Sequence, residues 1–156
     1  MLFLGDYVDR GAYGPEIVLL LFALKQRFPD QIYMLRGNHE TREMTESYNF
    51  REQCIDMYDE EFYDEVMNTF DMLPIAAVVN GLYLCMHGGI SQNIPSVESI
   101  NQVDRKMEPP DEGLLCDIMW ADPADGYDYD VDTPYEFNDL REVSCVFGKG
   151  PVNRLL

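Results

Sequence analysis

The stretch LFLGDYVDRG, residues 2–11, carries the strongest indication of how this chain folds. A short apolar run ends there in a glycine-containing turn with acidic side chains. The same pattern returns in IYMLRGNHE, residues 32–40, and in LYLCMHGG, residues 82–89. Apolar runs of this length bounded by turns are typical of buried strands. Because open α/β folds place their sites beyond the carboxyl ends of strands, we expect three strands to bring polar groups to one edge of a sheet.

Helices are expected between these strands. Residues 15–28 begin with a proline and stop just before Pro29, which is the pattern of a helix with proline in its first turn. Together with the first two apolar runs they predict a strand, helix, strand unit. Apolar side chains recur at helical spacing over residues 51–73, and Pro74 ends the pattern, so one or two more helices are expected.

A hairpin is expected next. Asn80-Gly81 suits the positive φ angles of a type I′ turn and separates two apolar runs, residues 76–79 and 82–86. A short helix near residues 113–120 and a strand over residues 143–147 are predicted further along the chain. The sequence therefore predicts an α/β fold, and 156 residues with 46% hydrophobic content favour one domain over several.

The composition argues against several classes of protein. A formal net charge of -18 argues against non-specific binding to nucleic acid, which needs a surplus of Lys and Arg. The longest apolar run, residues 17–24, is far shorter than the roughly 20 residues that cross a bilayer, and no leader opens the chain, so we expect a soluble protein without membrane contact. The four cysteines form no C-x-x-C pair, which argues against a disulfide framework or a zinc knuckle and favours the cytoplasm or the nucleus. Two acidic stretches, residues 56–65 and 122–139, are interpreted as solvated faces.

The first turn carries two carboxylates and a guanidinium. Asp6 and Asp9 lie three residues apart, and Arg10 follows directly. Carboxylate oxygens bind hard divalent cations and can bridge two of them, and the planar fork of arginine matches phosphate oxygens. Taken alone, the pattern fits a capped turn with a surface ion pair equally well.

The two histidines of the chain, His39 and His87, both fall at strand-end turns. Asn38 places an amide oxygen beside the first, and two glycines after the second leave room for close approach. Each feature alone has an ordinary structural explanation, an Asx turn or a structural histidine. Together with the carboxylates they form a mixed oxygen and nitrogen set, typical of dinuclear hydrolase centres that use manganese, iron or zinc.

The segments GDYVDRG, LRGNHE and MHGG, in this order and spacing, resemble the signature blocks of the phosphoprotein phosphatase family of serine/threonine phosphatases. The likeness runs through the whole chain, and residues 104–123 with the acidic stretch before Arg141 are most similar to the calcineurin catalytic branch of that family. The resemblance implies an α/β metallophosphoesterase-type sandwich of two mixed β-sheets flanked by helices, with the metals at one edge. Residues 1–156 would be a central part of that catalytic domain, incomplete at both ends.

By the same resemblance, three residues bind metal ions. Asp6 would bridge two ions, and Asn38 and His87 would ligate the second of them. The implied cofactors are two metal ions, either manganese or a pair of iron and zinc.

The resemblance assigns the chemistry to four other residues. His39 would donate a proton to the leaving alcohol with Asp9 as its carboxylate partner, and Arg10 and Arg141 would hold the phosphate oxygens. The implied reaction is the hydrolysis of phosphoserine and phosphothreonine in phosphoprotein substrates. A metal-bound hydroxide would attack phosphorus in line, without a phosphoenzyme.

The chain departs from the family pattern in several places. A G-D-x-H-G block upstream of the first strand, and a further histidine downstream of Arg141, have no counterpart in these 156 residues. One metal would then keep only Asp6 as a ligand, and we expect the chain by itself to be essentially inactive. Glu142 stands where the family usually has glycine. The segments that bind a calcium-sensing subunit and calmodulin in the calcineurin branch would lie beyond the end of this chain.

Two other functions fit the same residues. Another metallophosphoesterase, such as a dinucleotide polyphosphate hydrolase or a nuclease, would use the same strand-end ligands, although LRGNHE and the E-P-P-x-x-G-x-x-C-D block favour the protein phosphatase. A non-catalytic phosphoprotein-binding scaffold that lacks part of the metal site is the second alternative. Such a scaffold would bind no stoichiometric metal.

Overall fold

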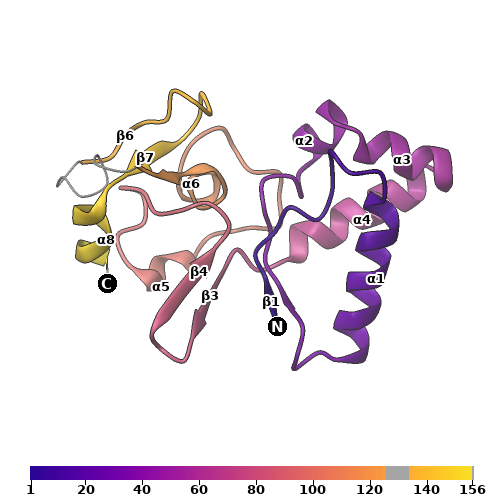
Figure 1. Ribbon diagram of the computed structural model, residues 1–156, viewed down its shortest axis with the longest axis horizontal. Helices are drawn as coiled ribbons and strands as arrows, with labels where there is room; N and C mark the ends of the chain where they lie inside the picture. The colour runs from indigo at the N-terminus through magenta and orange to yellow at the C-terminus, as the bar shows by residue number, and fades with distance from the viewer. Residues whose placement is uncertain (126–133, 156) are drawn as a thin grey trace. The chain divides into compact units, whose positions relative to one another are not determined.

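The first two predicted strands lie side by side and run parallel in the computed structural model. β1 (Leu2–Phe3) pairs with β2 (Tyr33–Met34) in the register Leu2 opposite Tyr33. The connection between them is α1 (Gly14–Arg27), which has proline in its first turn as predicted (Figure 1). The predicted strand, helix, strand unit is therefore confirmed. Because the strands are parallel, the turn after β1 and the turn after β2 leave the same edge of the sheet.

The chain folds into two units, each with its own core. Unit 1 consists of Met1–Pro74 and Lys106–Glu108, and unit 2 consists of Ile75–Arg105 and Pro109–Leu156. The expectation that residues 1–156 belong to one catalytic domain stays a prediction, and the two units are described separately below.

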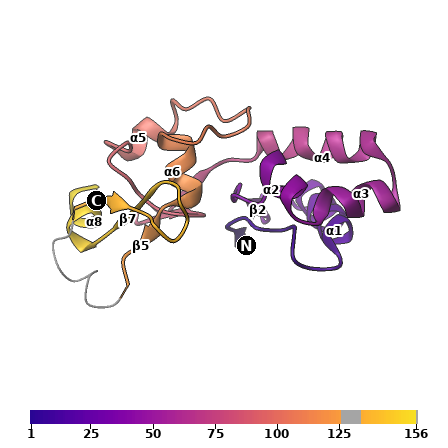
Figure 2. The same ribbon diagram turned by 90° about the horizontal axis from the view of Figure 1, so that it is seen from above.

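Unit 1 is mostly helical. The structure places two helices over the segment for which one or two were predicted, α3 (Phe50–Met57) and α4 (Glu60–Met72). A short helix that was not predicted, α2 (Arg42–Ser47), begins directly after the second polar turn and is capped by the Thr41 hydroxyl. Figure 2 shows α3 and α4 beside α1. These helices bury apolar side chains against the sheet, including Val18, Phe50, Cys54, Met67 and Phe70.

Unit 2 begins with the predicted hairpin. β3 (Ala76–Val79) pairs antiparallel with β4 (Tyr83–Met86). Asn80 and Gly81 have φ angles of 54° and 67°, so both turn residues are left-handed, as a type I′ turn requires. β3 and β4 form a sheet of their own. The expectation of three strands in one sheet is therefore right for β1 and β2 and wrong for β4, whose only strand partner among the described residues is β3.

The remainder of unit 2 contains short elements around two small cores. The predicted helix is α6 (Leu114–Trp120), and the predicted strand is β7 (Cys145–Phe147). β7 lies between β5 and β6 in a three-stranded mixed sheet. The other elements are α5 (Val97–Ile100), β5 (Asp122–Pro123), β6 (Glu136–Phe137) and α8 (Lys149–Leu155). The buried side chains include Ile75, Ile94, Leu115, Ile118, Met119, Ala121 and Phe147.

The structure describes residues 1–125 and 134–155. The acidic side chains of residues 56–65 are exposed along the outer side of α3 and α4, which confirms their interpretation as a solvated face. The second acidic stretch, residues 122–139, falls partly outside the described residues. No helix in the described part of the chain is both long enough and apolar enough to cross a membrane.

Candidate active site

His39 and Asp9 form the closest pair among the predicted catalytic residues. They come from the turns after β2 and β1, so the parallel pairing of these strands brings them together. His39 Nδ1 lies 2.6 Å from Asp9 Oδ2, and both side chains are almost completely buried. Asp9 Oδ1 also accepts a hydrogen bond from the amide of Phe50 at 3.0 Å. Asp9 thus orients the imidazole, whose Nε2 is buried and makes no hydrogen bond within the described residues.

A buried carboxylate shapes the turn that carries Asp6. Glu40 accepts hydrogen bonds from the amides of Asp6 at 2.7 Å, Tyr7 at 2.7 Å and Gly37 at 2.9 Å. Asp6 and Asp9 have φ angles of 58° and 68°, a left-handed backbone that residues other than glycine seldom adopt. Burial raises the pKa of Glu40 to about 7, although its amide donors act in the opposite direction. Three amides on one carboxylate keep this strained turn in place.

Asp6 and Asn38, two of the three predicted metal ligands, lie on neighbouring turns. Asp6 Oδ1 accepts a hydrogen bond from the amide of His39 at 3.3 Å, and Asn38 is 7% exposed. Gly37 allows the turns to approach, because a Cβ there would lie 2.7 Å from Asp6 Oδ1. A carboxylate and an amide oxygen fit a hard cation in kind. Among the described residues there is no group of three or more His, Cys, Asp or Glu side chains that could hold a metal ion.

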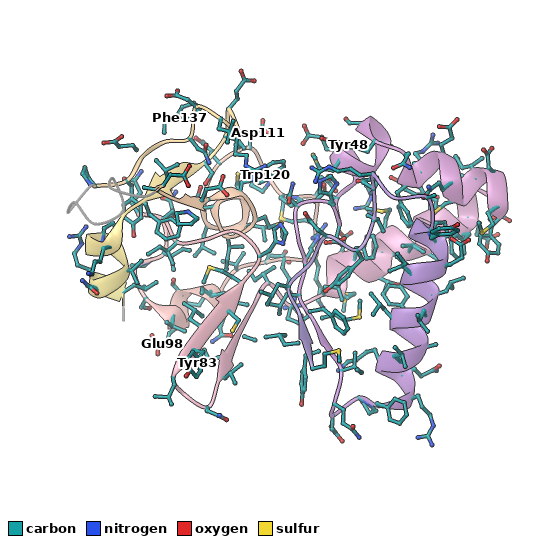
Figure 3. The ribbon with its side chains drawn as sticks, in the orientation of Figure 1. Tyr48, Tyr83, Glu98, Asp111, Trp120 and Phe137 are labelled. Carbon is teal, nitrogen blue, oxygen red and sulfur yellow. The ribbon has the colours of Figure 1, made fainter. Side chains whose placement is uncertain are left out.

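Arg10 is held by its backbone and by an aromatic ring. Its φ angle is 60°, its amide donates to Asn49 Oδ1 at 2.9 Å, and Asn49 Nδ2 donates to the carbonyl of Gly11 at 2.9 Å. The guanidinium carbon lies 5.3 Å from the centroid of the Tyr48 ring. The same ring meets the His39 imidazole edge-on, with centroids 5.0 Å apart. Tyr48, labelled in Figure 3, is half-exposed, so Arg10 and its aromatic neighbour are open to solvent.

Arg36 supports the second turn from inside the protein. The side chain is fully buried and donates to the carbonyl of Glu40 at 2.9 Å, to Asp71 at 2.6 Å and to the carbonyl of Met107 at 2.9 Å. Burial lowers the pKa of Arg36, while Asp71 acts in the opposite direction. Arg36 therefore anchors the polar turn after β2 and also the segment Lys106–Glu108.

His87 lies in unit 2, directly after β4. The amide of the next residue, Gly88, donates to the carbonyl of Ile118 in α6 at 2.9 Å. A Cβ on Gly88 would lie 2.6 Å from the carbonyl carbon of Met119, and a Cβ on Gly89 would collide with the Phe147 ring. The two glycines thus let the His87 turn pack against the end of α6. The room that they were predicted to leave beside His87 as a metal ligand stays a prediction.

Arg141 lies in the loop between β6 and β7, where a carboxylate already binds it. Arg141 Nε donates to Asp122 Oδ2 at 2.9 Å, and Asn138 Nδ2 donates to the same oxygen at 2.9 Å. The hydrogen bond from Arg141 lowers the pKa of Asp122, and His87 acts in the same direction. Glu142, at the position where glycine was expected, has a φ angle of 58°. The loop therefore keeps the left-handed backbone that glycine favours, although the residue is glutamate.

The structure gathers the predicted residues into two groups. Unit 1 contains five of them, on the turns after β1 and β2: Asp6, Asp9, Arg10, Asn38 and His39. Unit 2 contains the other two, His87 and Arg141. Their roles in metal binding and catalysis stay predictions.

Sequence reasoning missed several residues that support these groups. Glu40 binds the amide of Asp6, and the Tyr48 ring packs against Arg10 and His39. Glu40 could have been suspected, because it directly follows Asn38-His39 at a strand end. Asn49 and Asp117 offered no such signal, since each acts on a loop far away in the sequence.

Comparison with known proteins places the whole chain within one family. The family model described as calcineurin-like phosphoesterase matches residues 1–156. In Saccharomyces cerevisiae, the chain is 47% identical to serine/threonine-protein phosphatase 2B catalytic subunit A1 over 127 residues, which is 81% of this chain and 23% of the relative. It is 43% identical to catalytic subunit A2 over 148 residues, which is 95% of this chain and 24% of that relative. The matched part is thus about a quarter of the length of these curated relatives.

A solved structure has the same fold. It is a protein serine/threonine phosphatase from Saccharomyces cerevisiae, described as similar to human phosphatase PP5, and the TM-score is 0.90 at 31% sequence identity. The match covers 99% of this chain and 47% of that one. The expected metallophosphoesterase-type α/β fold is therefore confirmed.

Proposed function

This chain belongs to the calcineurin-like phosphoesterase family, and on that basis we propose that it hydrolyses phosphoserine and phosphothreonine in proteins. The observation that carries the proposal is the buried pair of His39 and Asp9, 2.6 Å apart, on the same two turns as Asn38 and Asp6. The names of two relatives, both catalytic subunits of a serine/threonine-protein phosphatase, support the same substrate class.

His39 is the proposed proton donor. Asp9 occupies Nδ1, so Nε2 is the nitrogen that can give a proton to the oxygen of the leaving serine or threonine. An alkoxide is a poor leaving group, so protonation in the transition state accelerates its departure strongly. The Tyr48 ring packs edge-on against the imidazole and adds to its orientation.

Arg10 and Arg141 are the proposed phosphate-binding residues. Each presents a planar guanidinium, whose donors match two phosphate oxygens at once. Arg10 is exposed and packs on Tyr48, and Arg141 is partly exposed and paired with Asp122. A phosphate bound to Arg141 would share the guanidinium with Asp122. The Asp122 carboxylate would thus fix the orientation of the guanidinium toward the phosphate.

Metal ions are part of the proposal. Asp6, Asn38 and His87 would hold them, with Asp6 as the shared ligand and manganese, or iron and zinc, as the expected elements. When bound, such ions supply Lewis-acid activation of water and neutralise negative charge on the phosphoryl oxygens. The residues of this chain would meanwhile hold the phosphate and supply the proton.

Phosphoproteins are the proposed substrates, and a regulatory subunit is a proposed partner because the two relatives are named catalytic subunits. The net charge of -18 sets a condition on the substrates, since it repels anionic partners at long range. Arginines and bound cations must therefore capture the phosphate locally. The cytoplasm or the nucleus stays the expected compartment.

The test uses the complete gene product that carries residues 1–156, supplied with manganese. We expect turnover of a phosphoserine peptide and of an aryl phosphate. His39→Gln should lower kcat on the peptide by about a hundredfold or more with little change in KM, because a proton donor acts in the transition state. The loss should be smaller on the aryl phosphate, whose leaving group needs no proton.

Three results would contradict the proposal. Turnover restricted to phosphodiesters or dinucleotides would assign the protein to another branch of metallophosphoesterases. An equal loss on both monoesters in His39→Gln would make His39 a structural residue. Absence of both turnover and stoichiometric metal would favour the non-catalytic alternative.

A further inference from the structure

The loop that carries Arg141 has a strained backbone. It joins β6 to β7, and two of its residues, Glu142 and Ser144, have φ angles of 58° and 61°. Left-handed backbone is unfavourable for residues other than glycine, and such conformations persist only where the surroundings enforce them. Some other part of unit 2 must therefore hold this loop.

Asn138 closes the loop on itself. Its carbonyl accepts from the amides of Glu142 at 2.8 Å and Arg141 at 3.2 Å, and its own amide donates to the carbonyl of Ser144 at 3.2 Å. Its side chain is buried and bonds Asp122 at 2.9 Å. These contacts define the shape of the loop and attach it to Asp122 of β5, but none of them joins it to α6.

Asp117 holds the loop from outside. Its side chain is on α6 and only 4% of the residue is exposed. Oδ1 accepts from the hydroxyl of Ser144 at 2.7 Å, and Oδ2 accepts from Asn93 Nδ2 at 2.9 Å. A buried carboxylate is unfavourable unless hydrogen bonds satisfy it. The buried position of Asp117 therefore requires donors such as Asn93 and Ser144, and Ser144 is held in turn by Asp117.

The same helix end also holds the His87 turn. The carbonyl of Ile118, the neighbour of Asp117, accepts from the amide of Gly88. One short helix thus orients the two loops of unit 2 that carry predicted site residues. Asp117 could satisfy its carboxylate with Asn93 alone, but it also accepts from Ser144, a strained residue three positions after Arg141.

We propose that Asp117 is a positioning residue for Arg141, which it orients through the hydroxyl of Ser144. The proposal rests on the proposed function, in which Arg141 binds the phosphate. Asp117 does not touch the substrate. It holds the strained loop so that the guanidinium stays on Asp122 and in one orientation before the phosphate arrives.

The experiment compares four single variants of the complete gene product and the double variant of Asp117→Ala with Ser144→Ala. Ser144→Ala removes the hydroxyl and keeps the fold of α6 intact, and Asp117→Ala removes the acceptor. Asp117→Asn retains an oxygen acceptor for Ser144, while its amide can pair with a rotated Asn93. Ser99→Ala is the control, because it deletes a serine hydroxyl bond elsewhere in unit 2, to the carbonyl of Ser96 at 2.6 Å.

Two readouts separate positioning from general stability. The first is the rate at which phenylglyoxal modifies Arg141, followed by peptide mass spectrometry, with Arg10 of unit 1 as internal reference. The second is the inhibition constant of inorganic phosphate, with kcat and KM for a phosphoserine peptide. Both are measured at a temperature where each variant is folded.

We expect Ser144→Ala to raise both the modification rate of Arg141 and the inhibition constant of phosphate by about three- to tenfold. A change of this size corresponds to part of the free energy of one hydrogen bond to a charged group. KM should rise with them and kcat should change less than twofold. Asp117→Asn should lie within about twofold of the parent protein. Asp117→Ala with Ser144→Ala should equal Asp117→Ala alone, because both act through one bond.

An unchanged Arg141 rate in both alanine variants would overturn the proposal. An equal rise at Arg10 and Arg141, accompanied by a lower melting temperature, would overturn it too, because that result is general loosening. If the parent protein has no turnover at all, the proposed function fails. The Arg141 modification rate then still decides whether Asp117 positions the arginine.

Discussion

The two loops that carry the predicted phosphate-binding arginines are built by opposite means. Both have left-handed backbone at residues other than glycine, Asp6, Asp9 and Arg10 in unit 1 and Glu142 and Ser144 in unit 2. In unit 1, the buried carboxylate of Glu40 binds three main-chain amides directly. In unit 2, a side-chain hydroxyl and a loop asparagine provide the support.

The difference predicts how each loop responds to damage. The unit 1 loop is tied to its core through main-chain amides that a buried carboxylate accepts, so its shape and the stability of unit 1 should be lost together. Asp117 and Asp122 reach the unit 2 loop through its side chains, so its arginine should be able to move while the unit stays folded. The two guanidinium groups also have different neighbours. That of Arg10 packs on the Tyr48 ring, and that of Arg141 forms an ion pair with Asp122.

The largest effect is expected from Glu40→Ala. The substitution removes the Glu40 acceptor of three main-chain amides, of which those of Tyr7 and Gly37 are buried. The free energy of unfolding should fall by about 3 to 5 kcal/mol. Far-UV circular dichroism during urea unfolding reports mainly on the helices of unit 1. Fluorescence of Trp120, the only tryptophan of the chain, reports on unit 2. The dichroism transition should move to lower urea than the fluorescence transition.

Glu46→Ala is the matched control, because Glu46 is exposed on the nearby α2. It should change the unfolding free energy by less than about 0.5 kcal/mol. If Glu40→Ala shifted both transitions by the same amount, the two units would unfold as one, and the contrast between the loops would not extend to stability.

An intermediate effect is expected from Asn49→Ala. This substitution removes the two hydrogen bonds that hold Arg10 and Gly11, about 1 kcal/mol of support for the loop. The inhibition constant of inorganic phosphate should rise by about three- to fivefold. Unit 1 should stay folded, because Glu40 still holds the turn before Arg10.

Asn68→Ala serves as the control for this experiment. Asn68 is exposed on α4 and makes one long contact with Arg42, at 3.4 Å. Phosphate inhibition should not change in this variant. Equal phosphate inhibition in Asn49→Ala and the parent protein would mean that Glu40 alone is enough to place Arg10.

The smallest effect is expected from Glu142→Gly. Glycine adopts a φ angle of 58° without steric cost, so relief of strain should exceed the added entropy of the unfolded chain by about 0.5 kcal/mol. The melting temperature should rise by about 1 to 2 °C. Glu136→Gly in β6 is the control and should lower it, because glycine weakens a strand. A decrease of equal size in both variants would show that the loop is not strained at Glu142.

Much of the architecture was visible in the sequence. The two parallel strands, the helix between them, the two helices before Pro74 and the Asn80-Gly81 hairpin follow from local patterns of apolar residues, glycine and proline. α2 and α8 were missed because both are short and neither has a clear apolar period. The separation of this hairpin from the sheet of β1 and β2 was missed, because strand-end chemistry does not report which strands share a sheet.

The sequence by itself determined which residues have the chemistry for a phosphoesterase site. Local patterns of apolar runs and turns show where strands end, and the carboxylates, the amide, the imidazoles and the arginines stand at or just beyond those ends. Only the tertiary structure decided what holds them. Glu40 acts on Asp6 across 34 positions, Asn49 on Arg10 across 39, and Asp117 on Ser144 across 27. Such contacts have no local signature, because a hydrogen bond depends on where two side chains meet after the chain has folded, and that position is set by the packing of whole elements.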